Sequence, residues 1–126
     1  MRKFLASAAI VFTLAGTVQA QGFDKGWKAY EAGDYATALQ QWRPLAEQGH
    51  PNAQFNLGVM HLKGQGVLQD YLMAHMWYNI ASANGYEAGA LGRDYIARRF
   101  LTAGYISKAQ VMAEDCMSSN YQNSGD

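Results

Sequence analysis

The chain has 126 residues, which suits a single domain, and its composition excludes several classes of function. Ten basic and ten acidic residues give a formal net charge of zero, so the chain has no basic field that would attract phosphate. We therefore expect that nucleic acid is not a partner. After the first twenty residues no stretch is apolar enough to span a bilayer, so we expect no stable membrane anchor in the mature protein.

Residues 1–20 have the three parts of a secretory signal peptide. Two basic residues follow the first Met, residues 4–15 form an apolar run, and Val18 and Ala20 occupy the −3 and −1 positions of a cleavage site. The alternative is a membrane anchor, but the run is shorter than the roughly 20 residues that a span requires. We expect cleavage after Ala20, which leaves eight basic and ten acidic residues, a formal charge of −2, in a periplasmic or secreted protein.

A set of residue types recurs with a period of 36 residues. Three pairs show this interval: Asp34 and Asp70, Trp42 and Tyr78, and Gly49 and Gly85. Such a period is typical of helical pairs that stack into a solenoid, because one hairpin cannot cover its own apolar face. We predict an all-α fold for residues 21–117, an α-solenoid of about three stacked antiparallel helical hairpins.

Gly, Pro and Asp residues mark the ends of six predicted helices. They are expected at residues 23–32, 35–48, 52–62, 71–83, 87–100 and 103–117. Asp34 and Asp70 are predicted N-caps, since a carboxylate accepts hydrogen bonds from the free amides of the first helical turn. For the last helix two starts stay open, either Thr102 as the N-cap or a capping box made by Ser107 and Gln110.

Packing expectations follow from side-chain size. Aromatic residues at helical spacing usually belong to the core, so we expect Trp42 and Trp77 to stabilise the fold. Gly58 should let a neighbouring helix approach closely. Residues 118–126 are polar and lack apolar periodicity, so the sequence predicts a disordered tail.

The central part of the chain carries a specific motif. Residues 53–60 read Ala-Gln-x-x-Leu-Gly-x-Met, residues 64–67 read Gly-x-Gly-Val, and residues 70–81 read Asp-Tyr-x-x-Ala-x-x-Trp-Tyr-x-x-Ala. This combination resembles the Sel1-like repeat family of tetratricopeptide-like helical hairpins. His61 stands where the family usually has Tyr, and Arg98 and Arg99 replace the Gly-rich turn that would begin a further repeat. The resemblance implies protein binding.

The resemblance also implies where a partner would bind, because the first helix of each hairpin lines the concave side of such solenoids. Seven residues share that helical phase: Lys28, Glu31, Asn52, Phe55, Asn56, Val59 and Lys63. Phe55 could instead belong to the core, and the others could be ordinary solvated residues.

Two functions stay open, an adaptor or regulator in the periplasm and an immunity or inhibitor protein that sequesters an envelope-acting toxic enzyme.

The residues that could carry chemistry form no recognised constellation. His50, His61 and His75 lack metal-ligand spacing, and Cys116 has no activating neighbour, so we predict no metal site, no cofactor site and no catalytic residue. Cys116 is the single cysteine, and it is either a buried small hydrophobe or one half of an intermolecular disulfide. We expect that the protein is not an enzyme.

Overall fold

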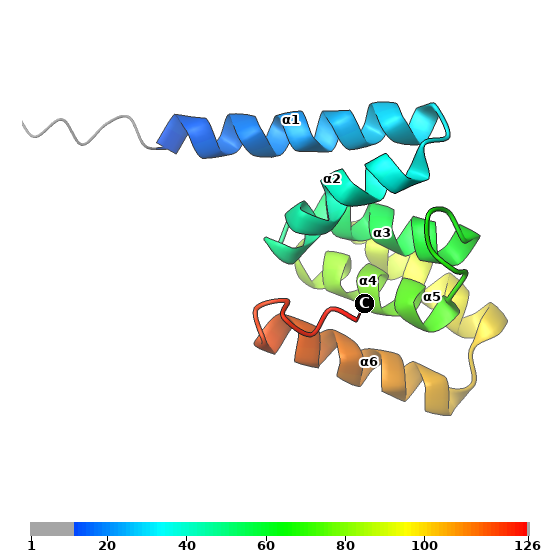
Figure 1. Ribbon diagram of the computed structural model, residues 1–126. Helices are drawn as coiled ribbons and strands as arrows, with labels where there is room; N and C mark the ends of the chain where they lie inside the picture. Colours follow the sequence, from blue (N-terminus) through cyan, green and yellow to red (C-terminus); the bar gives the residue numbers. More distant parts are fainter. Residues whose placement is uncertain (1–11, 126) are drawn as a thin grey trace, which may run out of the picture.

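The computed structural model describes residues 12–125, with side chains from residue 18 onward, and this part of the chain is entirely helical (Figure 1). Most of the predicted signal peptide therefore lies outside the described residues. Six helices follow in order: α1 (Phe12–Glu31), α2 (Tyr35–Glu47), α3 (Pro51–Lys63), α4 (Tyr71–Ala83), α5 (Glu87–Phe100) and α6 (Ala103–Ser118). Within that range no helix has both the length and the apolar content needed to cross a membrane.

Five of the six helices have the bounds that the sequence predicts, to within one residue at each end. The exception is α1, which begins at Phe12 instead of residue 23 and runs without a break past Ala20. Its first half contains no Pro, and the helix of the uncleaved chain continues through the predicted cleavage site.

The helices pack consecutively, α1 on α2, α2 on α3, α3 on α4 and α4 on α5, as expected for a solenoid of helical hairpins. This order confirms the predicted fold class. The last helix departs from it, because α6 packs against α4 rather than along α5 (Figure 1). Helix α4 consequently has neighbours on several sides, and eight of its 13 residues are buried.

The N-caps confirm the predicted helix starts. The Oδ1 atom of Asp34 accepts a hydrogen bond from the Thr37 amide at 3.2 Å, and that of Asp70 accepts one from the Met73 amide at 3.1 Å. For α6 the structure decides between the two open alternatives, since the Thr102 side chain is the N-cap acceptor. Each cap satisfies an amide that has no partner within its helix.

The main core forms where α1, α2, α3, α4 and α6 meet, and both predicted tryptophans lie in it. Trp42 is 1% exposed and Trp77 is 2% exposed, which confirms their assignment to the core. The Trp42 indole N–H donates to the Phe23 carbonyl at 3.1 Å, so this buried polar group is satisfied.

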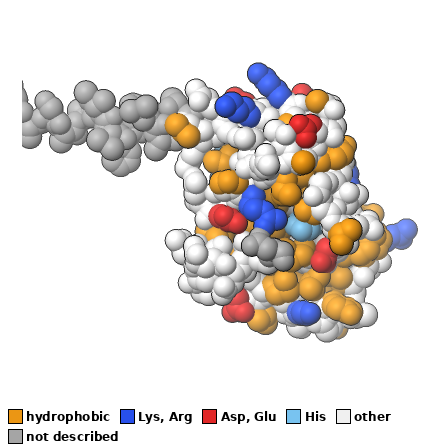
Figure 2. All heavy atoms as spheres, in the orientation of Figure 1, with side chains coloured by type: hydrophobic (Ala, Val, Ile, Leu, Met, Phe, Trp, Pro, Cys, Tyr) orange, Lys and Arg blue, Asp and Glu red, His pale blue; other side chains and the backbone are white. Residues whose placement is uncertain are grey.

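On the face seen in Figure 2, charges of both signs are scattered among hydrophobic side chains.

Two glycines allow the helices around α4 to approach closely. A Cβ atom on Gly58 would lie 2.5 Å from the Tyr78 ring, which confirms the expectation for this residue. A Cβ atom on Gly89 would lie 2.5 Å from the Tyr78 carbonyl oxygen and 2.8 Å from the Ser82 amide nitrogen. Helices α3 and α5 can therefore pack on α4 only because these two positions lack side chains.

The residues after α6 have contacts that the sequence did not predict. The Tyr121 ring packs against the main core, and its hydroxyl accepts a hydrogen bond from the Asn84 amide at 3.0 Å. Ser124 is 4% exposed and donates to the Glu47 carboxylate at 3.4 Å. In place of the expected disordered tail, the described residues 119–125 fold back on α2 and α4, because one aromatic anchor and two hydrogen bonds fix them.

We predict opposite effects for two Gly→Ala substitutions within helices. Gly89→Ala should destabilise the protein by about 1–3 kcal/mol, because the new methyl group collides with the α4 backbone. Gly104→Ala should stabilise it by about 0.5–1 kcal/mol, because nothing approaches closer than 4.0 Å and Ala favours a helix. Urea unfolding followed by circular dichroism measures both changes; an equal gain in stability from both substitutions would contradict the close packing of α5 on α4.

Candidate functional site

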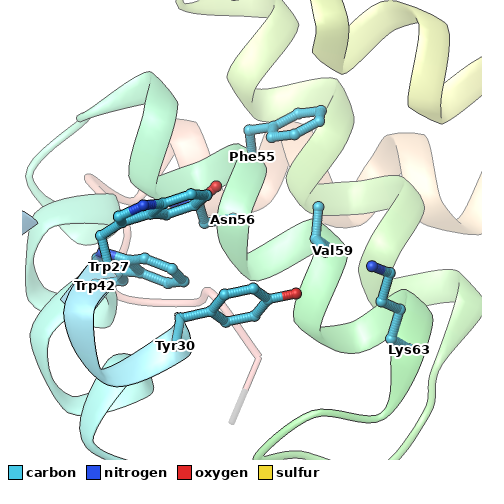
Figure 3. Close-up of a pocket in the computed structure, with 7 residues that line it drawn as sticks. All are labelled: Trp27, Tyr30, Trp42, Phe55, Asn56, Val59 and Lys63. Atoms are coloured by element: carbon cyan, nitrogen blue, oxygen red, sulfur yellow. The ribbon is translucent and has the colours of Figure 1, made fainter. Parts of the chain in front are cut away.

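A groove lies between α1 and α3, with α2 at its base (Figure 3). Trp27 and Tyr30 from α1 form one wall, and Trp42 from α2 lies below them. The other wall comes from α3 and consists of Phe55, Asn56, Val59 and Lys63. The cavity has a volume of about 290 Å³, which is enough for one or two large side chains.

The groove continues toward the start of α3 as a second hollow of about 370 Å³. Both hollows share three lining residues, namely Trp27, Phe55 and Asn56. The second hollow adds Phe23, Asp24, Asn52 and Tyr86. Asp24 thus carries a negative charge near one end of the groove, and Lys63 carries a positive charge near the other.

The aromatic side chains of the first wall support one another. Trp27 stacks on Tyr30 with ring centroids 5.9 Å apart, and both rings contact Trp42 at 6.1 and 5.6 Å. The Tyr30 hydroxyl donates to the side-chain oxygen of Gln65 at 2.7 Å, which fixes the outer end of its ring. Trp27 nevertheless remains 45% exposed, so its ring offers a rigid apolar surface to a ligand.

On the opposite wall, Phe55 contributes both to the core and to the surface of the groove, while its role as an anchor for a partner stays a prediction. Its ring packs against Tyr78 at 5.0 Å and Tyr86 at 4.9 Å, and it belongs to the partly buried residues around the smaller core cluster. It also lines both hollows. Phe55 therefore joins the core of α3–α4 to the surface of the groove.

Asn56 provides the only buried polar atom in the lining of the groove that lacks a partner within the described residues. Its side-chain nitrogen is closed to solvent and has no hydrogen-bond acceptor. Leaving a buried N–H without an acceptor costs about 1–3 kcal/mol, and a ligand carbonyl in the groove would remove that cost once the Asn56 side chain turns toward it. The arrangement suits the binding of a peptide segment, with apolar side chains over the aromatic rings and a backbone carbonyl toward Asn56.

The structure brings together five of the seven residues that the sequence singled out. They all belong to α3 and line one or both hollows: Asn52, Phe55, Asn56, Val59 and Lys63. Lys28 and Glu31 are exposed on α1 but do not line the groove, because the turn of the helix directs Trp27 and Tyr30 toward α3 instead.

Sequence reasoning missed the aromatic wall. Trp27 and Tyr30 were not among the predicted partner-binding residues, and Trp42 was predicted only as a core residue. The signal that points to them is the spacing of Phe23, Trp27 and Tyr30, which places three large rings on one side of α1. A terminal helix that packs mainly on one neighbour buries only part of such a stripe, and the rest faces solvent.

His50 and Cys116 have structural positions in the described chain. His50 caps α3, and its Nδ1 atom accepts a hydrogen bond from the Ala53 amide at 3.2 Å. Cys116 is fully buried, and desolvation, with a smaller contribution from Glu47, raises the pKa of its thiol to about 11. Of the two alternatives for Cys116, a buried small hydrophobe and one half of an intermolecular disulfide, its burial therefore supports the first. Among residues 18–125, no three His, Cys, Asp or Glu side chains are grouped to hold a metal ion.

Two buried histidines lack a hydrogen-bond partner at Nδ1 within the described residues, namely His61 and His75. Burial lowers the pKa of both imidazoles. At His61, Asp70 opposes the shift and Arg43 adds to it, while at His75 the nearby Arg93 adds to it and Asp94 opposes it. Both imidazoles are therefore held in the neutral form. His61 also lines a hollow of about 620 Å³ on the side of α2 and α4.

Residues 51–86, which contain all of α3 and α4, match the family model of the Sel1 repeat. The chain is 31% identical over 80 residues to an exopolysaccharide production negative regulator of Rhizobium leguminosarum bv. viciae, covering 64% of this chain and 30% of that protein. It is 30% identical over 87 residues to a protein of the same description from Rhizobium meliloti (strain 1021), covering 68% and 32%. The chain thus spans less than a third of these relatives. No solved structure matches it.

We predict that the protein loses stability as the pH falls from 7.5 to 5.5. Because folding lowers the pKa of His61 and His75, these two imidazoles take up protons in the unfolded chain at a higher pH, near the ordinary value of 6.5, than they do in the folded chain. This contribution to the free energy of unfolding is complete above pH 6.5. It is lost as the pH falls through the folded-state pKa values of the two histidines.

The substitution His61→Tyr should make this pH dependence shallower, since Tyr does not titrate in that range and the neighbouring hollow has room for its hydroxyl. Thermal unfolding of both proteins across the pH series tests this. An identical slope for the variant would contradict the role assigned to His61.

Proposed function

We propose that this chain, whose residues 51–86 form a Sel1 repeat of the kind that mediates protein–protein interaction, is an exported bacterial regulator that holds a partner protein in the groove between α1 and α3. The observation that carries this proposal is the groove itself, which is lined by four aromatic residues, among them the 45% exposed Trp27, next to the buried Asn56 amide that lacks an acceptor.

The chemistry of the groove indicates an extended peptide segment as the bound element. Trp27 and Phe55 provide aromatic anchors on opposite walls, which is the type of residue that dominates binding energy at interfaces. A carbonyl of the segment would accept from Asn56. Asp24 and Lys63 lie near opposite ends, so they favour a segment with a basic group at one end and an acidic group at the other.

Export is compatible with binding in this groove. Cleavage after Ala20 would shorten α1 to residues 21–31 and would leave every α1 side chain that lines the groove in place. The side-chain contact that would be lost joins Gln19 to Gln48 at 3.2 Å, and it is exposed to solvent. We therefore infer that the mature periplasmic or secreted chain retains the complete site.

The descriptions of the relatives favour a regulator over an inhibitor of a toxic enzyme. The two relatives named above are described as negative regulators of exopolysaccharide production. This chain matches less than a third of each. We infer that its binding activity serves regulation of an envelope process, with exopolysaccharide production as the first process to measure.

Site-specific crosslinking tests the groove. A photo-reactive phenylalanine analogue at Val59, inside the groove, should capture one predominant partner in the cell envelope. The same analogue at Val111, which is 55% exposed on α6, is the matched control and should not capture it. Asn56→Leu should reduce capture at position 59 at least about tenfold, because the amide donor is lost, and should stabilise the free protein by about 1–3 kcal/mol.

Genetic complementation distinguishes the two functions. Deletion should raise exopolysaccharide yield, the wild-type chain should restore it, and the Asn56→Leu chain should fail to do so although it folds. If deletion kills or slows the cells and the captured partner is a degradative enzyme, the inhibitor function replaces the regulator. Equal capture at positions 59 and 111 would contradict partner binding in the groove, for the regulator and for the inhibitor alike.

We predict that the exported protein begins at Gln21, because Val18 and Ala20 occupy the positions that signal peptidase recognises. Mass spectrometry of the periplasmic and culture fractions measures the N-terminus. Ala20→Phe should block processing, since a bulky residue replaces the small one at the −1 position. Recovery of an intact chain that begins at Met1 in the soluble envelope fraction would contradict cleavage.

A further inference from the structure

The outward face of α5 is not covered by any other part of the described chain. Helix α5 packs on α4 through Gly89 and Ile96, which are buried, and α6 packs on α4 instead of on α5. On the opposite side of α5, Leu91 is 74% exposed and Tyr95 is 55% exposed. Two large apolar side chains are thus left in solvent at the end of the hairpin stack, where the next hairpin of a longer solenoid would lie.

This face is shaped and held in position. Leu91, Tyr95, Arg98 and Arg99 enclose a shallow hollow of about 400 Å³. The Tyr95 ring meets the edge of Phe100 at 5.9 Å, and Phe100 stacks on Tyr71 at 4.2 Å. Tyr95 is therefore supported by a chain of rings that ends on α4, which restricts this one side chain before a partner docks.

The residues along this face form a symmetric pattern. Glu87, Leu91, Tyr95 and Arg99 follow one another at intervals of four residues, and Arg98 lies on the same side of the helix as Glu87. Glu87 comes first, the two apolar residues lie in the middle, and the basic residues come last. Asp94, whose carboxylate is paired with Arg93 at 3.0 Å, lies at the margin of this face. Reversing the helix direction therefore places apolar side chains on apolar side chains and each acid on a base.

We propose that this face docks a second copy of the chain, with the two α5 helices antiparallel about a two-fold axis near Arg93. Leu91 of each copy then packs on Tyr95 of the other, and Glu87 of each copy lies next to Arg98 and Arg99 of the other. Such a contact is self-complementary and closed, which is the commonest arrangement of homodimers. The antiparallel helix dipoles also favour it.

Charge complementarity is the reason for choosing a second copy as the occupant. The same face presents both signs of charge with an apolar centre between them, so a uniformly acidic surface would be attracted by the arginines but repelled by Glu87.

One helix pair buries less than a standard interface, so the dimer should dissociate reversibly, with a dissociation constant on the order of 10 µM. The groove between α1 and α3 shares no lining residue with this face, so each dimer would present two open grooves.

Sedimentation equilibrium of the mature chain, residues 21–126, tests the dimer. The mass should rise from monomer to dimer between about 1 and 200 µM protein. Leu91→Glu should weaken dimerisation at least tenfold, and the matched substitution Val111→Glu on α6 should leave it unchanged. Both positions are exposed, so circular dichroism should show a folded helical protein in each case.

A charge-reversal pair tests the antiparallel orientation. Glu87→Arg alone, and Arg98→Glu with Arg99→Glu alone, should each be monomeric at the concentration at which the wild type dimerises, because like charges face each other. Mixing the two variants should restore dimers that contain one copy of each. A wild-type monomer at 200 µM, an unaffected Leu91→Glu dimer, or the absence of mixed dimers would each overturn the proposal, whatever the groove binds.

Discussion

The structure depends on the enclosure of Tyr78 by helices that carry glycine where they touch it. Gly58 of α3 and Gly92 of α5 approach the ring from two sides, and Gly89 packs on the backbone beside it. Desolvation, with a smaller effect of Tyr30, raises the pKa of the Tyr78 hydroxyl to about 12, which reflects how little water reaches it. With α3 and α5 held this closely, α4 becomes the central helix, and the other elements are arranged around it.

The groove is a consequence of that enclosure. Phe55 packs on Tyr78 and on Tyr86, so the packing that closes the core of α3–α4 also sets one wall of the groove. The opposite wall depends on Trp42, whose indole N–H donates to the Phe23 carbonyl of α1. Both walls are therefore attached to buried residues, and a binding surface with such support loses little freedom on association.

Two features of the molecule leave groups without favourable surroundings. The buried Asn56 amide nitrogen has no acceptor within the described residues, and the exposed Leu91 and Tyr95 side chains leave apolar surface in water. They lie on different helices and do not share lining residues. If both interact, a dimer with two grooves would bind a partner with two matching segments more tightly than either groove alone, because the second contact is intramolecular.

Local chemistry determined the parts of the structure that the sequence predicts well. Helix ends follow from Gly, Pro and Asp, and Trp42 and Trp77 are core because large rings at helical spacing must be buried. Five residues of the groove followed from helical phase on α3, given the resemblance to a repeat family.

Only the tertiary structure decided that Trp27 and Tyr30 complete the groove, that α6 lies on α4 rather than α5, and that Tyr121 anchors the chain end. These outcomes depend on contacts between residues far apart in the sequence, for which no local pattern exists. Spacing within one helix fixes which side chains share a face, but the packing of neighbouring helices fixes whether that face is covered, lines a groove or stays open.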